Sequence, residues 1–229
     1  MSHPPVSSLR SRQRSGFTLT ELMIVIAIVG ISTALAVPSI NQWAANSRLY
    51  DMTRTVDAAF GLARGEAKRT GNVHLIFFGS DTALAPLTDG GGNSVDMLVI
   101  NDGLPGSANQ NCLIDAGEQL RGWSLPAQGD VQPGPVLATT RAPNDSGGTA
   151  FGSTVTFTDA SGTAIGLWVM FRPDGTTRSF SNDCSMGAIG SGAGAVYLHN
   201  DTRDSAIVLN ALGGSRVHSW DDDSGVWTN

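Results

Sequence analysis

The sequence has few of the residues that build most catalytic and metal-binding sites. Only two of its 229 residues are cysteine and four are histidine, and the histidines are scattered along the chain at His3, His74, His199 and His218. It contains no Gly-x-Ser-x-Gly, His-Glu-x-x-His or phosphate-binding loop motif. Two cysteines without clustered histidines are too few for a zinc site. We therefore expect a protein that is not an enzyme and that needs no cofactor for catalysis.

Charged residues are also scarce. They make up 15% of the chain, and 20 acidic residues outnumber 14 basic ones. An acidic protein repels the phosphates of nucleic acids unless it carries a local basic patch, so the net charge argues against general DNA binding. Glycine is frequent by contrast, with 28 residues, which suits an exported β-rich domain with long loops. The length leaves room for one globular domain.

An apolar run of about twenty residues follows a short basic leader, residues 1–16. The leader has three arginines and no acid, so the positive-inside rule keeps it in the cytoplasm. A secretory signal peptide has its small-residue cleavage site after the apolar run, whereas Gly16 precedes the run here. Cleavage after Gly16 therefore leaves the apolar helix on the mature protein. One acid, Glu21, interrupts the run, and a carboxylate in hydrocarbon is costly enough to indicate a functional residue with a partner.

This arrangement resembles the type IV prepilin signal, G|FTLxEL, at Gly16, Phe17, Thr18, Leu19, Glu21 and Leu22. The resemblance implies that a prepilin peptidase cleaves between Gly16 and Phe17 and methylates the new amino group of Phe17. It also implies that Glu21 pairs with this amine on a neighbouring subunit during assembly. The alternatives are an ordinary signal anchor and a lone acid that is neutralised by protonation.

The resemblance also implies a location and a set of partners. We expect a single-pass inner-membrane protein with a cytoplasmic N-terminus and a periplasmic head, which enters a periplasmic pseudopilus or a pilus after assembly. The expected partners are other pseudopilins or pilins of the filament, the prepilin peptidase, the inner-membrane assembly platform and the lipid bilayer.

One long helix is expected from residue 17 to residue 70. Its first part, 17–38, is the transmembrane segment, and Pro38 lies where pilins often have a helix-bending proline. From residue 39 to 70, apolar residues recur at steps of three and four, which predicts an amphipathic continuation. Thr70-Gly71 is a plausible C-cap.

After Gly71 the pattern changes to short strands separated by Gly, Asn, Asp and Pro clusters. Strands are expected at 73–78, 97–101, 154–158, 167–171, 176–181, 195–199, 206–209 and 215–220, and loops at 80–95, 126–152 and 182–194. The expected fold class is α+β, with the long N-terminal helix packed on an antiparallel β-sheet head at 71–229. This is the pilin-like fold.

Within that superfamily, the segment Val169-x-Phe171-x-x-Asp174-Gly175 and the terminal hairpin resemble the GspH/FimT family. This resemblance implies a GspH-like minor pseudopilin, a structural subunit of the periplasmic pseudopilus of a type II secretion system. The alternative is a FimT/FimU-like minor pilin for assembly of a type IV pilus, with DNA uptake as an additional role.

The DNA-binding alternative depends on the last long strand. Some FimT proteins bind DNA through a terminal Gly-Arg-x-Arg motif, and Ser215, Arg216 and His218 stand at its glycine and arginine positions. One arginine and a mostly neutral histidine neutralise about one phosphate at pH 7, so Arg216 and His218 are weak candidates and DNA is not an expected partner.

Cys112 and Cys184 both lie in the head. A pair of cysteines in an oxidising compartment is most simply a disulfide, and two free thiols are the alternative. A bridge would close a loop of about 70 residues and stabilise the head by about 4 kcal/mol in the chain-entropy model.

The Gly-rich segment 101–118 concentrates oxygen ligands, namely Asp102, Asn109, Asn111, Asp115 and Glu118. Calcium prefers carboxylate and amide oxygens in flexible loops, although this spacing departs from the EF-hand register. Two interpretations stay open: a calcium site, and Asx turns that need no metal.

Overall fold

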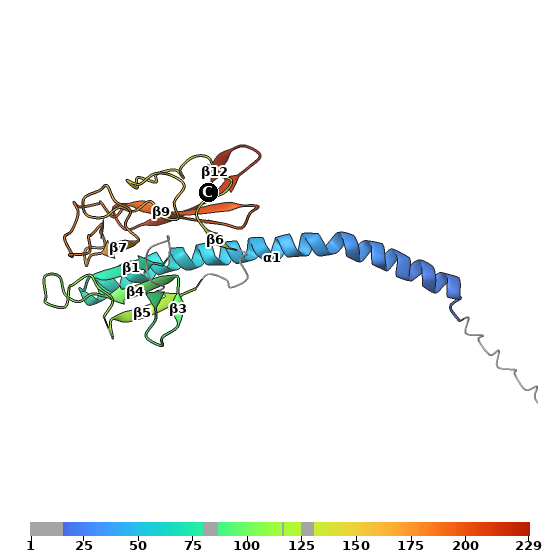
Figure 1. Ribbon diagram of the computed structural model, residues 1–229, viewed down its shortest axis with the longest axis horizontal. Helices are drawn as coiled ribbons and strands as arrows, with labels where there is room; N and C mark the ends of the chain where they lie inside the picture. Colours follow the sequence, from blue (N-terminus) through green and yellow to red (C-terminus); the bar gives the residue numbers. More distant parts are fainter. Residues whose placement is uncertain (1–15, 80–86, 116, 125–130) are drawn as a thin grey trace, which may run out of the picture. The chain divides into compact units, whose positions relative to one another are not determined.

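The computed structural model describes residues 16–79, 87–115, 117–124 and 131–229. The expected cytoplasmic leader up to residue 15 lies outside these residues. The chain forms two compact units, one ending at Trp43 and the other comprising Ala44–Asn229, and we call the second unit the head. Helix α1 (Leu19–Thr70) contributes to both units (Figure 1).

Helix α1 ends where the sequence predicts. Gly71 adopts φ +74° and donates its N–H to the carbonyl of Ala67 at 3.0 Å, so it is the left-handed C-cap residue. Lys68 and Arg69 lie in the last turn, where cations interact favourably with the helix dipole.

The head half of α1 is the centre of the core. Its buried side chains form one stripe: Leu49, Met52, Val56, Ala59, Phe60, Ala63 and Ala67. The ring of Phe60 lies 6.2–6.3 Å from the rings of Phe78, Phe157 and Phe171. These residues belong to one cluster that also contains inward-facing side chains of both large sheets. Within the head, α1 therefore runs between two sheets, as Figure 1 shows.

The first sheet has the order β5-β4-β1-β7-β8 and the second has the order β12-β11-β10-β9-β6; every pairing in them is antiparallel. The strands of the first are β1 (His74–Phe78), β4 (Met97–Asn101), β5 (Gln119–Trp123), β7 (Trp168–Phe171) and β8 (Thr177–Arg178). Those of the second are β6 (Gln132–Pro133), β9 (Gly194–His199), β10 (Asp204–Leu209), β11 (Ser215–Asp221) and β12 (Val226–Thr228). A small ribbon pairs β2 (Leu87–Thr88) with β3 (Ser94–Val95). The architecture is therefore α+β and pilin-like.

The strand predictions are largely confirmed, with informative exceptions. Segment 154–158 makes only isolated bridges, Val155 to Val196 and Thr158 to Ile165, so the strand expected there is wrong. Its apolar side chains still fill the core, which explains the alternating pattern. The strand expected at 176–181 is limited to β8. The sequence pattern does not predict β5, β6 or β12. Strand β6 lies in segment 126–152, and β2 and β3 lie in segment 80–95, so the expectation that these two segments are loops is wrong there. Residues 80–86 and 126–130 of these segments are outside the described structure.

Buried polar contacts fasten the loop at 135–152 to the second sheet. Asp204 accepts N–H bonds from residues 136, 137 and 138 on a single oxygen, at 2.6–3.0 Å. The hydroxyl of Tyr197 donates to Asp145 at 2.8 Å and accepts the N–H of Ala142. Arg141 completes the network with an ion pair to Asp145. These buried hydrogen bonds hold an irregular segment in one conformation.

Candidate functional site

The expected processing site lies directly before α1. Gly16 and Phe17 are outside regular secondary structure, and Phe17 is 84% exposed. A peptidase needs an accessible backbone that is free of helical hydrogen bonds, and this junction meets that requirement. The structure is thus compatible with cleavage between these two residues, which stays a prediction.

Glu21 has a partner within its own chain. Its carboxylate accepts hydrogen bonds from the backbone N–H and the hydroxyl of Thr18, each at 3.0 Å. The N–H of Glu21 in turn reaches the Thr18 hydroxyl oxygen at 3.2 Å. This reciprocal pair is a capping box, which satisfies donors that the start of a helix otherwise leaves free. The sequence signal for it is the pattern Thr-x-x-Glu at Thr18–Glu21.

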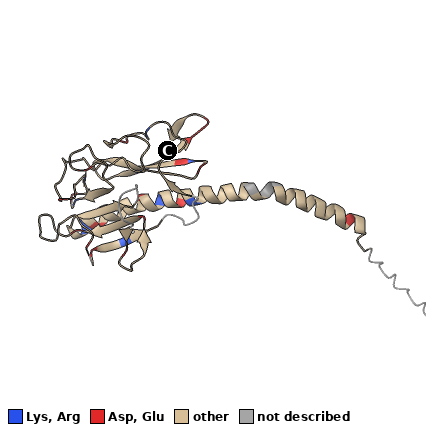
Figure 2. Ribbon diagram, in the orientation of Figure 1, with Lys and Arg blue, Asp and Glu red and all other residues tan. Residues whose placement is uncertain are grey.

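The first half of α1 carries apolar side chains that nothing in the described chain covers. Over Leu22 to Ile31 its large apolar residues are 52–66% exposed. An 18-residue window of α1 has a mean hydropathy of 2.3, long and apolar enough to cross a membrane. Glu21 is the one charged residue between Phe17 and Trp43 (Figure 2).

The two cysteines are joined. Cys112 and Cys184 form a disulfide with their Cα atoms 5.3 Å apart, linking the 102–118 loop to the turn at 181–186. Asp102 supports this link because its carboxylate accepts the N–H groups of Asn111 at 3.2 Å and Cys112 at 3.0 Å. The second oxygen of Asp102 is buried without a partner among the described residues. Burial raises the pKa of Asp102 to about 6.

The calcium candidates make local contacts with one another and with the backbone. Asn111 donates its amide to Asp115 at 2.7 Å and accepts the N–H of Leu113 at 2.9 Å, which is Asx-turn geometry. Burial raises the pKa of Glu118. Within the described residues, the one close group of possible metal ligands is Asp102 with the two sulfurs of the disulfide, and it includes neither Asp115 nor Glu118. Asn109 packs its Cβ near Gly103. The contacts favour the Asx-turn interpretation, and calcium binding stays untested.

The two DNA-binding candidates lie on the same face of β11 and differ in exposure. Arg216 is exposed, whereas His218 is only 2% exposed. Burial, with a smaller contribution from Arg216, lowers the pKa of His218. Both residues line a cavity of about 320 Å³ with Asn144 and Asn210. A buried neutral histidine offers no charge to a phosphate backbone, so Arg216 is the one cation among the residues that line this cavity.

Comparison with known proteins gives one match confined to the N-terminal segment and longer matches to fimbrial proteins. Residues 11–37 match the family model of the prokaryotic N-terminal methylation motif. The fimbrial protein EcpC of Eikenella corrodens is 30% identical over 119 residues, which cover 51% of this chain and 70% of EcpC. A fimbrial protein of Neisseria meningitidis is 31% identical over 128 residues, 52% of this chain and 71% of that protein. This chain belongs to the type IV pilin-like superfamily.

The type IV pilin-like assignment reaches beyond the anchor helix. The type IV major fimbrial protein FimA of Dichelobacter nodosus is 42% identical over 65 residues, but these cover only 26% of this chain and 40% of FimA. The longer matches to EcpC and to the meningococcal protein extend the likeness into the pilin-like head. No solved structure matches the chain significantly. Family membership indicates a filament subunit that assembles with other pilins and whose apolar helix is consistent with a membrane anchor.

Proposed function

We propose that this chain is a structural subunit of a type IV pilin-like filament, stored in the inner membrane and added to the fibre after removal of its leader. The observation that carries the proposal is the first half of α1, which is apolar, exposed and interrupted by one acid beside the processing site. Exposed apolar surface of this extent needs lipid or other helices around it. Both surroundings occur in turn when a pilin leaves the bilayer and enters a filament.

Glu21 has a defined role in this proposal. Cleavage after Gly16 by a prepilin peptidase would create a positively charged amine on Phe17, adjacent to the Thr18 N–H that Glu21 already accepts. In the fibre, the same carboxylate would pair with the Phe17 amine of a neighbouring subunit. A charge-assisted hydrogen bond in a low-dielectric fibre is strong, and loss of either partner leaves a buried charge. The pair would therefore fix the axial register of subunits delivered by the assembly platform.

The test uses the full-length protein in its own cells. A Glu21→Ala variant is expected to insert and to lose its leader but to be absent from sheared filaments, and Thr20→Ala is the matched control beside it. Leader removal is read from the mass of the protein and incorporation from immunoblots of purified fibres. Normal incorporation of Glu21→Ala would refute the role assigned to the acid.

The filament in this proposal is either a type IV pilus or a type II secretion pseudopilus. The matched relatives are fimbrial by name, which supports a subunit of a type IV pilus. The alternative is a GspH-like minor pseudopilin of a type II secretion system, whose head would lie in the periplasm. A deletion strain decides between them. Loss of surface pili with normal secretion supports the pilus, and periplasmic accumulation of secreted proteins with normal pili supports the pseudopilus.

A further inference from the structure

Four cations from distant parts of the sequence flank one turn, Arg172–Thr176, at one end of the head. The turn Arg172–Thr176 packs on the end of α1 so closely that a Cβ on Gly175 would overlap Lys68 and lie 3.4 Å from the Nε of Arg64. In the same hairpin, the charges of Arg172 and Arg178 both act on the carboxylate of Asp174. We call Arg64, Lys68, Arg172 and Arg178 the basic tip.

The basic tip has little to balance it. Asp174, an acid within the turn, accepts the N–H and the hydroxyl of Thr176 at 2.8 and 2.6 Å. Among the described residues none of the four cations forms an ion pair, and the Nε atoms of Arg64, Arg172 and Arg178 are buried without a hydrogen-bond partner. Gathering like charges costs free energy, and the cost is unexpected in a chain of net charge −6. An anionic partner would remove it.

Exposed apolar side chains lie beside the basic tip. Leu212 is 69% exposed and precedes Gly213, whose position is in contact with Arg64 and the carbonyl of Gly175. Ile189 is 74% exposed in the adjoining turn, where Gly190 approaches Ala211. Arginine together with apolar side chains is the composition of a protein–protein interface.

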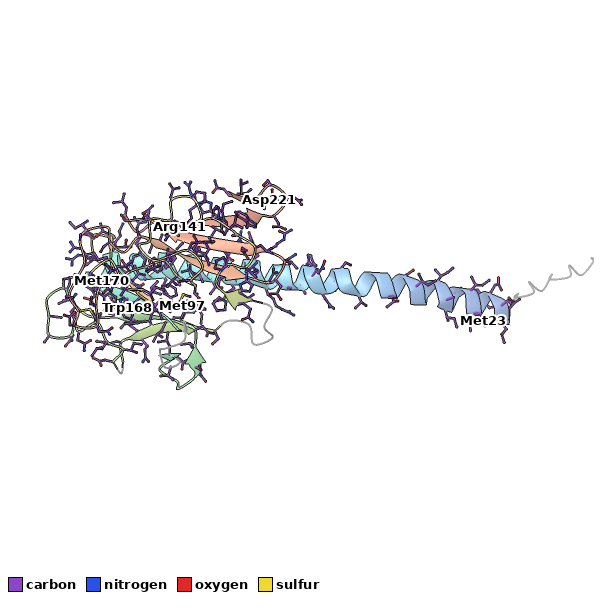
Figure 3. All side chains as sticks on the ribbon, turned by 45° about the horizontal axis from the view of Figure 1, so that its top comes forward. Met23, Met97, Arg141, Trp168, Met170 and Asp221 are labelled. Carbon is purple, nitrogen blue, oxygen red and sulfur yellow. A yellow bond between two sulfur atoms is a disulfide. The ribbon has the colours of Figure 1, made fainter. Side chains whose placement is uncertain are left out.

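The opposite end of the head carries three consecutive acids, Asp221–Asp223, near the turn that exposes Asp201 and Arg203. Asn200 donates to Asn46 at 2.7 Å, so the turn between β9 and β10 lies at the start of the head helix, 18 residues or about 27 Å from Arg64. Strand β11 returns to that end, because Ser219 pairs with Ser205, and the next turn exposes Asp222 and Asp223. Figure 3 labels Asp221 at this end and Met170 at the other. We call Asp221–Asp223 the acidic turn.

We propose that the basic tip of one subunit binds the acidic turn of a second copy of this chain, head to tail along the filament. This inference rests on the proposed function. Both halves of the contact are present on one head, at opposite ends, so the contact is heterologous and continues from copy to copy without closing. Exposed Val226 follows the acidic turn and gives Leu212 and Ile189 an apolar counterpart. Nucleic acid would match the charge of the tip but leave these apolar side chains in water.

A charge-swap experiment tests the contact in full-length protein. Lys68→Glu with Arg172→Glu reverses the tip, and Asp222→Lys with Asp223→Lys reverses the acidic turn. We expect either reversal alone to lower the number of copies in sheared filaments about tenfold or more, since like charges would then face each other. All four substitutions in one chain should restore incorporation. Arg54→Glu with Arg121→Glu, two exposed cations elsewhere on the head, is the control with the same change in charge.

The outcomes separate this inference from the proposed function. Incorporation that survives either reversal, while Glu21→Ala is excluded from the same fibres, overturns the contact and leaves the filament role intact. A tip reversal that the fourfold variant does not repair also overturns it, and a gel shift of the tip variants against duplex DNA then shows whether the tip serves nucleic acid. Absence of the wild-type chain from fibres overturns both proposals. Thermal melting of each variant shows that the head is folded.

Discussion

The two halves of α1 have similar lengths and both contain many apolar residues, but they face different surroundings. In the half before Ala44 the large apolar side chains that the structure describes are exposed, as in Ile26 at 60%. In the half after it they are buried, as in Phe60 at 0%. The hydrophobic effect stabilises the head only through the second half, because burial of apolar area within the chain is what contributes to folding. The first half keeps its apolar surface for lipid and for other helices.

The largest expected effect tests this division directly. Phe60→Ala removes a ring that three other phenylalanines contact, and truncation of a buried aromatic side chain lowers the free energy of unfolding by about 3–5 kcal/mol. Ile26→Ala, on the same helix, should leave unfolding of the head unchanged. Tryptophan fluorescence during urea titration of detergent-solubilised protein measures both. Equal losses would mean that the division at Ala44 is wrong.

The disulfide is a second feature that stabilises the head and has no counterpart in the first half of α1. Cys112→Ser with Cys184→Ser opens a loop with a sequence separation of 72, and we expect a loss of about 2–4 kcal/mol, with the chain-entropy model at the upper end. The same urea titration measures it, and wild-type protein under reducing conditions is the comparison. Unchanged stability in the double variant would show that the contacts of Asp102 hold the 102–118 loop without the bridge.

A pH titration tests the buried acid of the head, Asp102. The pKa of Asp102 is about 6 in the folded head and about 4 when unfolded, so between these values the folded state holds a proton that the unfolded state has released. The free energy of unfolding should therefore fall as pH rises from 4 to 6, by at most about 3 kcal/mol, and be flat above that.

Asp102→Asn isolates this contribution from the other acids. It keeps an acceptor for the N–H groups of Asn111 and Cys112 and removes the titration. The difference in unfolding free energy between the variant and wild type should change between pH 4 and pH 6. A constant difference over that range contradicts the assignment to Asp102.

The sequence predicted the helix and most strands because both depend on local periodicity. The stripe that contains Phe60 and the continuous apolar run Ala206–Leu209 of β10 are visible without any structure. Segment 154–158 misled the prediction because Val155 and Phe157 point into the core as strand residues do, while the backbone makes only single bridges. Strand β5, with the sequence QLRGW, has no clear alternation and gave no signal.

The candidate sites also divide into those with a local sequence signal and those that only tertiary packing creates. The processing motif and the cysteine pair were readable because their chemistry is local or has one partner. The basic tip was not, because the turn that begins at Arg172 packs on Arg64 and Lys68 from about 100 residues away in sequence. The burial of His218, which removes it as a phosphate ligand, likewise follows from the fold and not from its motif.

The smallest expected effect concerns the start of helix α1. Thr18→Ala removes the capping box with Glu21 and should destabilise the first turn of α1 by about 1 kcal/mol, while Thr18→Ser restores most of it. Hydrogen exchange at the Leu22 amide, which bonds to the carbonyl of Thr18 at 3.2 Å, reports this fraying in micelles. Thr33→Ala in mid-helix is the control. Head unfolding should not respond to any of the three, since nothing in the head contributes to this cap. Exchange that is equally fast in Thr18→Ala and wild type would mean that Glu21 is free of its own chain before assembly, and the neighbouring amine would then be its first partner.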